Sequence, residues 1–393
     1  MAACPYEGAR IHLAIDAVNI RQGGGLTHLS RLLAHADPVA AGIQRVSVWV
    51  NAGVAQQLPV APWLSIHSAS WMSAALPVRI AGQQWVLPAA MRDAGCDVLF
   101  SPGGSISSRL RNPVVTLSQN MLPFEAAERR RFPRGVTRAK LFLLAMTQGH
   151  SFRRATGVIF LSRYAQAALC AQLGIDSKRT ALIPHGIDVR FRRLPRPARV
   201  LSDCSPSDPL RLLYVSIAMP YKHQLELVQA VHQLQQAGLP LRLDLVGAGW
   251  QGYGRRLQAL LDQLDPQSEH LVWHGEVDFA TLHEHYHAAE VFVFASSCEN
   301  LPNILLEAMA AGLPIACSDR GPMPEVLGEA GVYFNPDDVG SIAAAIRTLA
   351  KDPELRERLA LQAYQQSLQY SWETCAKQTF GFLAQVAAEA DTN

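Results

Sequence analysis

Short apolar runs alternate with amphipathic stretches from one end of the chain to the other. Runs rich in Val, Ile and Leu predict buried strands at residues 11–16, 46–50, 98–101, 114–118, 157–162, 210–217, 241–247, 271–275, 291–296, 314–318 and 332–334. Stretches between them, such as 26–36 and 224–238, have the apolar spacing of helices. Buried strands that alternate with helices are typical of parallel sheets covered on both faces, so we expect an α/β fold.

The length and one change in composition predict two domains. The 393 residues exceed what a single core usually holds, and residues 192–209 contain four prolines and no helical periodicity. We expect two doubly wound, Rossmann-like domains facing each other across a cleft, at residues 1–200 and 207–371. A C-terminal helix at about 372–390 is expected to pack back on the first domain. Ligands of such sheets collect at the carboxyl ends of the strands.

Composition narrows the class of protein. Hydrophobic residues make up 49% of the chain and charged residues 17%, which excludes a disordered chain. The net charge of +2 gives no overall attraction to nucleic acid, and we expect no nucleic-acid partner. Seven scattered cysteines without a CxxC pair indicate a reducing compartment. Since we find neither a signal-peptide pattern nor an apolar stretch of about 20 residues, we expect a cytoplasmic protein.

The segment HEHYH at 283–287 has the HExxH spacing of zinc proteases, and Glu307 lies 20 residues beyond it. Helical periodicity instead places these polar residues on a solvated flank, opposite a buried face of Phe279, Leu282, Tyr286 and Ala289. We therefore expect no metal site, and a zinc hydrolase stays open as a minor alternative.

Two glycine motifs are candidates for binding phosphate, and the sequence supports one of them better than the other. Gly247, Gly249 and Gly252 match GxGxxG, but a strand and a helix already precede them and no acid follows at the expected place, which favours a tight turn. Residues 23–25, three glycines, follow the first strand and open a helix. Their backbone can approach a ligand closely, and the helix start offers N–H groups to an anion. A flexible connection is the alternative for this loop.

Glu307 lies in a helical stretch whose other residues are nearly all apolar, ILLEAMAA. An unpaired buried charge costs several kcal/mol, so this carboxylate must meet a cation or accept from hydroxyls. Glu299 stands eight residues earlier, just after the strand at 291–296, which places it at the carboxyl edge of the sheet. Two carboxylates with a helix start between them suit a ligand with hydroxyls at both ends and negative charge in its middle. A nucleotide sugar has that form.

Several motifs occur in a characteristic order. These are IPHGID at 183–188, SIAMPYKH at 216–223, the E-x7-E spacing of Glu299 and Glu307 within 271–338, the GPMPE turn, and YSWETCAKQTF at 370–380. Together they resemble family 4 retaining glycosyltransferases with the GT-B fold, over nearly the whole chain. The likeness is most specific at 271–338.

The resemblance implies an enzyme that moves a hexose from a nucleotide sugar to a glycan or lipid-linked acceptor with retention, in surface polysaccharide biosynthesis such as that of lipopolysaccharide, O-antigen or exopolysaccharide. It assigns the hexose hydroxyls to Glu299, the ribose hydroxyls to Glu307 and the pyrophosphate to Lys222. Backbone N–H groups would assist from Gly23, Gly24, Gly25, Asn300, Leu301 and Asn303. The family usually needs no metal, and no other cofactor is expected.

The chain departs from the family pattern twice. The arginine usually found beside the donor-binding lysine is absent, since Tyr221 and Ile217 stand near Lys222. A histidine common after the fourth or fifth strand is absent too, and Ser118, Gln119 and Asn120 occupy that neighbourhood. These three are candidates for hydrogen bonds to the sugar or acceptor.

Residues Arg129 to Arg154 include eight basic residues and no acid, around the apolar LFLLAM. Anionic lipid headgroups attract such segments at about 1 kcal/mol per basic residue. A peripheral contact with the inner face of the cytoplasmic membrane and a merely solvated basic helix both stay open. Membrane contact would favour a lipid-linked acceptor.

Two other functions stay open beside transfer. A GT-B nucleotide-sugar epimerase binds a similar donor without an acceptor. A non-catalytic nucleotide-sugar-binding partner of an assembly complex would be consistent with the missing arginine and histidine.

Overall fold

The computed structural model describes residues 11–21 and 23–391. The chain divides into two compact units. Among the described residues, unit 1 consists of those up to Phe124, Ala139–Gly186, and those from Tyr370 to Asp391. Unit 2 consists of Glu125–Arg138 and Ile187–Gln369. A short segment of the first half therefore belongs to the second unit, for which the sequence gives no signal.

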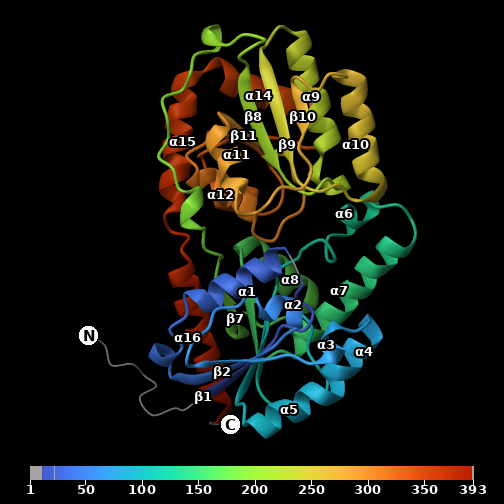
Figure 1. Ribbon diagram of the computed structural model, residues 1–393, viewed down its shortest axis with the longest axis vertical. Coiled ribbons are helices and arrows are strands. Elements are labelled where there is room, and N and C mark those ends of the chain that lie inside the picture. Colours follow the sequence, from blue (N-terminus) through green and yellow to red (C-terminus); the bar gives the residue numbers. More distant parts are fainter. Residues whose placement is uncertain (1–10, 22, 392–393) are drawn as a thin grey trace. The chain divides into compact units, whose positions relative to one another are not determined.

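Unit 1 is built on a parallel sheet with the strand order β3-β2-β1-β4-β5-β6-β7 (Figure 1). Its strands are β1 (Ile11–Asp16), β2 (Ile43–Trp49), β3 (Leu64–His67), β4 (Val98–Ser101), β5 (Val114–Leu117), β6 (Gly157–Phe160) and β7 (Thr180–Leu182). The central strands β4, β5 and β6 are buried along their whole length, as their unbroken apolar runs predict. The edge strands β3 and β7 were not predicted. Both are short and only partly buried, so they lack that signal.

The helices of unit 1 are α1 (Gly24–Ala34), α2 (Ala52–Ala55), α3 (Ser70–Ser73), α4 (Leu76–Ala81), α5 (Leu87–Ala94), α8 (Arg163–Leu173) and α16 (Trp372–Asp391). Helix α7 (Val136–Arg154) begins in the segment of unit 2 and continues into unit 1. Helix α1 buries His28, Leu29, Leu32 and Leu33 at helical spacing and lies beside α16, although some 350 residues separate them in the chain. Among the described helices, none is long and apolar enough to cross a lipid bilayer.

Unit 2 is built on a second parallel sheet with the strand order β10-β9-β8-β11-β12-β13. Its strands are β8 (Leu210–Val215), β9 (Leu241–Val246), β10 (Leu271–Trp273), β11 (Val291–Phe294), β12 (Ile315–Ser318) and β13 (Val332–Phe334). With the sheet of unit 1, this confirms the predicted pair of doubly wound, Rossmann-like sheets.

Helices cover both faces of the second sheet. The helices of unit 2 are α6 (Ala126–Arg131), α9 (Gln224–Gln236), α10 (Gln251–Leu264), α11 (Leu282–Ala288), α12 (Asn303–Ala310), α13 (Met323–Leu327), α14 (Val339–Lys351) and α15 (Pro353–Ser367), of which α6 contacts the turn after β8 and not the sheet. Helices α9 and α14 pack against each other, and α12 packs against α15. Right-handed crossovers require α11 and α12 to lie on the face opposite α9 and α10, and Figure 1 shows α11 and α12 in front of this sheet.

The proline-rich segment 192–209, from which the sequence predicts the boundary between two domains, is fixed along unit 2. Arg193 Nη1 donates to the carbonyl of His287 at 2.9 Å, and Arg196 donates to the carbonyl of Ala289. Both carbonyls lie at the C-terminal end of α11, the end of a helix that cations stabilise.

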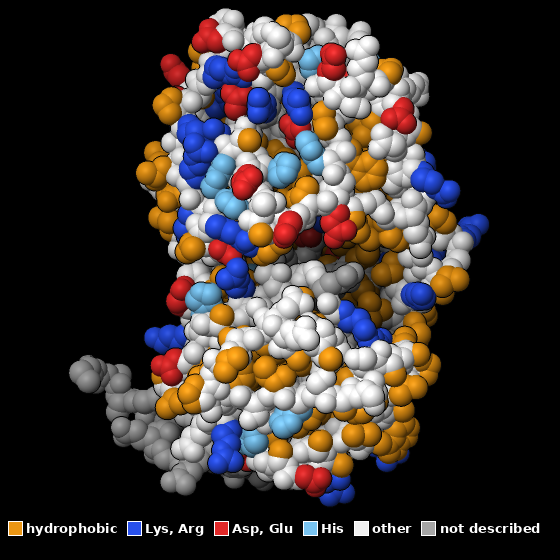
Figure 2. Space-filling model, viewed as in Figure 1, with side chains coloured by type: hydrophobic (Ala, Val, Ile, Leu, Met, Phe, Trp, Pro, Cys, Tyr) orange, Lys and Arg blue, Asp and Glu red, His pale blue; other side chains and the backbone are white. Residues whose placement is uncertain are grey.

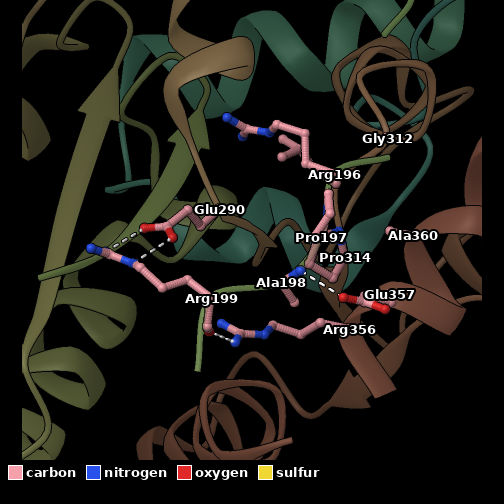
Figure 3. A pocket seen from close by; sticks show the side chains of 11 residues that line it. Arg196, Pro197, Ala198, Arg199, Glu290, Gly312, Pro314, Arg356, Glu357 and Ala360 are labelled. Carbon is pink, nitrogen blue, oxygen red and sulfur yellow. Dashed lines mark hydrogen bonds and ion pairs between the residues drawn. The ribbon is translucent and has the colours of Figure 1, made fainter. Parts of the chain in front are cut away.

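Further along, the same segment borders a cavity of about 110 Å³ (Figure 3). Arg199 donates to the carboxylate of Glu290 through Nε at 3.1 Å and Nη2 at 3.0 Å. The buried Arg356 side chain donates to the carbonyl of Arg199. These contacts make the segment part of the fold of unit 2.

Candidate functional site

The strand order of unit 2 places two loops together. The order reverses between the paired strands β8 and β11, so the loops that follow these two strands leave the sheet side by side. Such a reversal point is where doubly wound sheets bind ligands. Lys222 lies in the loop after β8, and Glu299 lies in the loop after β11. Two residues that are 77 positions apart in the chain are thereby brought to one place.

Lys222 and Glu299 form a shielded ion pair. Lys222 Nζ donates to Glu299 Oε1, and the side chains are 6% and 16% exposed. Burial lowers the pKa of Lys222, but the charge of Glu299 and the hydrogen bond to it outweigh burial and hold the pKa above its ordinary value. The hydroxyl of the buried Tyr214 donates to the backbone carbonyl of Lys222 at 2.8 Å. The loop therefore presents a charged ammonium group in a fixed position.

The turn after Glu299 leads into helix α12. Asn300 and Leu301 are 4% and 8% exposed, and Asn303 is the first residue of the helix. The N-cap residue is Pro302, and no side chain caps the helix start. The partial positive charge of this helix start lies next to Glu299 in sequence and is suited to a negatively charged group.

Glu307 lies on α12, about one turn after its start at Asn303, and its contact explains how an acid is kept in an apolar helix. The hydroxyl of the fully buried Tyr286 donates to Glu307 Oε2 at 2.8 Å. Burial raises the pKa of Glu307 to about 7, while Tyr286 and the charge of Arg190 oppose that rise. Sequence reasoning missed both partners, since they lie in the HEHYH segment and beside the IPHGID motif, far from Glu307 in the chain.

Unit 1 places its predicted residues at the end of its own sheet. Gly23, with φ of 69°, is the N-cap of α1, and Gly24 and Gly25 begin that helix directly after the β1 loop. A Cβ at Gly25 would lie 3.4 Å from Oε1 of Gln119, so the glycine loop touches the segment after β5. In that segment Ser118 is buried, and Asn120 Oδ1 accepts from the N–H of Leu122 at 3.0 Å.

The other predicted residues of the site lie in unit 2, so the structure gathers the candidates into two groups, one in each unit. Lys222, Glu299 and the α12 start form one group. The glycine loop with Gln119 forms the other. Their predicted joint action on one ligand stays a prediction.

The two alternative motifs have structural explanations. Gly247 has φ of 135°, and a Cβ there would lie 2.2 Å from the carbonyl oxygen of Ser216, so this glycine serves the tight turn that we favoured. The rings of His283 and His287 lie 5.6 Å apart in an edge-on arrangement. Among the described residues, no group of three or more His, Cys, Asp or Glu side chains is arranged to hold a metal ion. Phe279 departs from its predicted buried position, since it precedes α11 and is 40% exposed.

Two family models match the chain. The model described as Glycosyltransferase Family 4 matches residues 24–191, and the model described as Glycosyl transferases group 1 matches residues 204–366. The second span contains Lys222, Glu299 and Glu307. Together the two spans take in most of both units.

Several curated proteins are similar to part of the chain. O-antigen chain mannosyltransferase B from Escherichia coli is 33% identical over 167 residues, which is 42% of this chain and 44% of that protein. A sulfoquinovosyl transferase from Arabidopsis thaliana is 30% identical over 205 residues, or 51% of this chain and 36% of that protein. The matched regions therefore span less than half the length of these relatives.

Solved structures resemble the chain over nearly its whole length. HepE from Anabaena in complex with UDP has a TM-score of 0.67 at 19% identity and covers 98% of this chain and 100% of its own. Sucrose-phosphate synthase from Thermosynechococcus elongatus has a TM-score of 0.73 at 20% identity, covering 97% and 100%. WaaG, a glycosyltransferase involved in lipopolysaccharide biosynthesis, has a TM-score of 0.69 at 15% identity, covering 95% and 99%. These likenesses show a shared fold.

Proposed function

We propose that this chain, whose two parts match glycosyltransferase family models and whose fold is GT-B, is a glycosyltransferase that moves a hexose from a nucleotide diphosphate sugar to a glycan or lipid-linked glycan. The observation that carries the proposal is the ion pair of Lys222 and Glu299 at the point where the strand order of the second sheet reverses. Glu299 stands four residues before Asn303, the first residue of α12. A buried cation, a carboxylate and a helix start meet there. A sugar diphosphate needs these three partners.

Each group has a distinct role in binding the donor. The Lys222 ammonium neutralises the diphosphate, and the start of α12 adds N–H dipoles to the same charge. Glu299 accepts hydrogen bonds from hexose hydroxyls. Glu307 accepts from the two ribose hydroxyls, with Tyr286 holding its carboxylate in place. Structures of HepE with UDP and UDP-glucose, and the GDP-mannose dependence of one Mycolicibacterium smegmatis relative, support a donor of this class.

Transfer proceeds with retention of the anomeric configuration in this proposal. The acceptor hydroxyl attacks the anomeric carbon on the face from which the nucleoside diphosphate leaves. The bond from that carbon to the phosphate oxygen breaks, and the departing phosphate takes the hydroxyl proton. Lys222 stabilises the charge that develops on the leaving group, a role that fixed cations fill well in a shielded site.

An assay of donor consumption tests this function. The protein is incubated with UDP- and GDP-hexoses, with and without lipid-linked glycans, and nucleoside diphosphate release is measured. We expect release that depends on the acceptor, and NMR of the product should show the donor's anomeric configuration. Conversion of the donor to an isomeric sugar without an acceptor would indicate an epimerase. A donor that binds but is never consumed would indicate a non-catalytic partner.

We also propose that α7 meets an anionic membrane surface, where a lipid-linked acceptor would be found. Phe142, Leu143 and Met146 on this helix are 57%, 60% and 56% exposed. Basic side chains interrupt the apolar surface along the edge where α7 lies (Figure 2). Exposed apolar groups beside cations are the combination that an interface of anionic lipids favours.

Removing three of these charges should release the protein from such membranes. In the variant Arg134→Gln, Arg138→Gln, Lys140→Gln, we expect about a hundredfold weaker partition onto vesicles, because each basic residue near the surface contributes about 1 kcal/mol. Flotation with phosphatidylcholine vesicles, with and without phosphatidylglycerol, measures this. The control neutralises three exposed residues of unit 1, Arg45, Arg92 and Lys178. Equal flotation of both variants, or flotation independent of phosphatidylglycerol, would remove the membrane proposal.

A further inference from the structure

Helix α6 reaches the second unit from the first half of the chain. The chain leaves unit 1 after Phe124, contributes Glu125–Arg138 to unit 2 and returns to unit 1 at Ala139. Arg131 Nη2 lies 2.8 Å from the carboxylate of Asp337, which follows β13. The ring of Phe132, only 3% exposed, packs edge-on against Trp250 with centroids 5.1 Å apart. An ion pair and aromatic packing therefore hold this segment on unit 2.

One acid of α6 faces inward from this position. Glu128 is 8% exposed, and its Oε2 accepts from the hydroxyl of Ser297 and from Arg131 Nε, each at 2.7 Å. Ser297 stands two residues before Glu299 in the loop after β11. The segment from the first half of the chain thus binds the loop that carries the hexose carboxylate.

Ser297 in turn forms hydrogen bonds to Tyr221 and His223, the residues before and after Lys222. Its N–H donates to the carbonyl of Tyr221 at 2.9 Å, and its Oγ lies 3.1 Å from Nε2 of His223. Ser297 Oγ lies 2.7 Å from Glu128 Oε2 and 3.2 Å from the carbonyl of Tyr221, so its proton goes to the shorter contact, and the tautomer of His223 that is protonated at Nε2 donates to Oγ. His223 is fully buried and its backbone has φ of 54°. Residues other than glycine rarely adopt this left-handed conformation, and they keep it when surrounding contacts hold them in place.

We propose that Glu128 is a positioning residue for the donor site: by fixing the Ser297 hydroxyl, it holds the Lys222 loop and the Glu299 loop in register with each other. The proposal rests on the donor-binding function proposed above. The carboxylate of Glu128 bonds to Ser297 and Arg131 rather than to Lys222 or Glu299, so it acts on the donor site through Ser297. The donor site of unit 2 is then complete only with a residue that stands 94 positions before Lys222 in the chain.

A double-mutant cycle in the full-length chain tests this role. UDP and GDP are titrated calorimetrically into the wild type, Glu128→Ala, Ser297→Ala and the double variant. We expect about tenfold weaker binding in each single variant, because each loses a hydrogen bond to a charged group. The double variant should lose no more than either single one, since both remove the same contact. Glu128→Gln keeps an acceptor oxygen and should recover most of the affinity.

The matched control is Glu329→Ala, which removes an exposed acid of unit 2 and should bind as the wild type does. Glu128→Ala binding UDP and GDP like the wild type would overturn the positioning role and leave the proposed function intact. A wild type that binds neither nucleotide would overturn the proposed function and the inference with it. If Glu128→Ala fails to fold, Ser297→Ala and Glu128→Gln carry the test, and full affinity of Ser297→Ala contradicts the proposal.

Discussion

Lys222→Ala should lower the kcat/KM of hexose transfer by about a thousandfold, the upper range for loss of one fixed group that stabilises developing charge. Lys222 is the cation of the shielded ion pair with Glu299. The arginine that family 4 glycosyltransferases usually have beside this lysine is absent here, where Tyr221 precedes Lys222. The stabilisation of the negative charge on the leaving diphosphate therefore depends strongly on this one side chain. A coupled assay of nucleoside diphosphate release measures the effect.

The control for this variant is Lys351→Ala, an exposed lysine at the end of α14 in the same unit. Its kcat/KM should match that of the wild type. Thermal melts of both variants separate a lost function from a lost fold. A folded Lys222→Ala enzyme with a rate within a few-fold of the wild type would show that the diphosphate is neutralised elsewhere.

Glu307→Ala should weaken the binding of the nucleoside diphosphate by about a hundredfold. Two hydrogen bonds from ribose hydroxyls to a charged acceptor are lost, and each contributes about 1.5 kcal/mol or more. The Tyr286 hydroxyl also loses its carboxylate partner. Calorimetric titration with UDP and GDP measures the change in Kd. Unchanged affinity in the folded variant would contradict the role given to Glu307.

The same carboxyl gives a pH dependence with a defined sign. Burial raises the pKa of Glu307 from an ordinary value of 4.5 to about 7. The folded protein therefore binds this proton more tightly than the unfolded chain does. Stability contributed by the protonated group is present at acidic pH and is lost as the pH rises from about 4.5 through 7, by up to about 3 kcal/mol.

Nucleotide binding should change in the opposite direction, because ribose hydroxyls donate to the ionised carboxylate. We expect the affinity for UDP or GDP to rise between pH 6 and 8 in the wild type, within the range set by a pKa of about 7. Glu307→Gln cannot ionise, so its affinity and its melting temperature should lose this component of their pH dependence. A wild-type affinity that is flat over this range, or that falls, would rule out the ionised form as the binding form.

The sequence predicted the parts of the fold whose signal is local. Strands such as β4 and β11 are buried on both faces and are readable as unbroken apolar runs, and the loops that follow β8 and β11 could be identified as ligand loops from their position. Glu307 stood out because its neighbours are apolar. Site residues could therefore be predicted where their residue type and their position after a strand were enough to identify them.

Contacts between distant segments could not be predicted in this way. Nothing around Tyr286 indicates that its hydroxyl meets a carboxylate 21 residues later, since its position equally suits a core residue. The sequence of α6 gives its helical pattern but not the unit on which it packs, because that choice depends on Asp337 and Trp250 far along the chain. The short strands β3 and β7 are only partly buried and depend on their neighbours for their conformation.

A crystal structure of the protein with UDP or GDP, whichever it binds more tightly, tests the central claim most directly. The account predicts the ribose hydroxyls about 3 Å from the Glu307 carboxylate and the diphosphate oxygens at a similar distance from Lys222 Nζ. A nucleotide bound elsewhere, with Glu307 and Lys222 making no contact to it, would contradict the account.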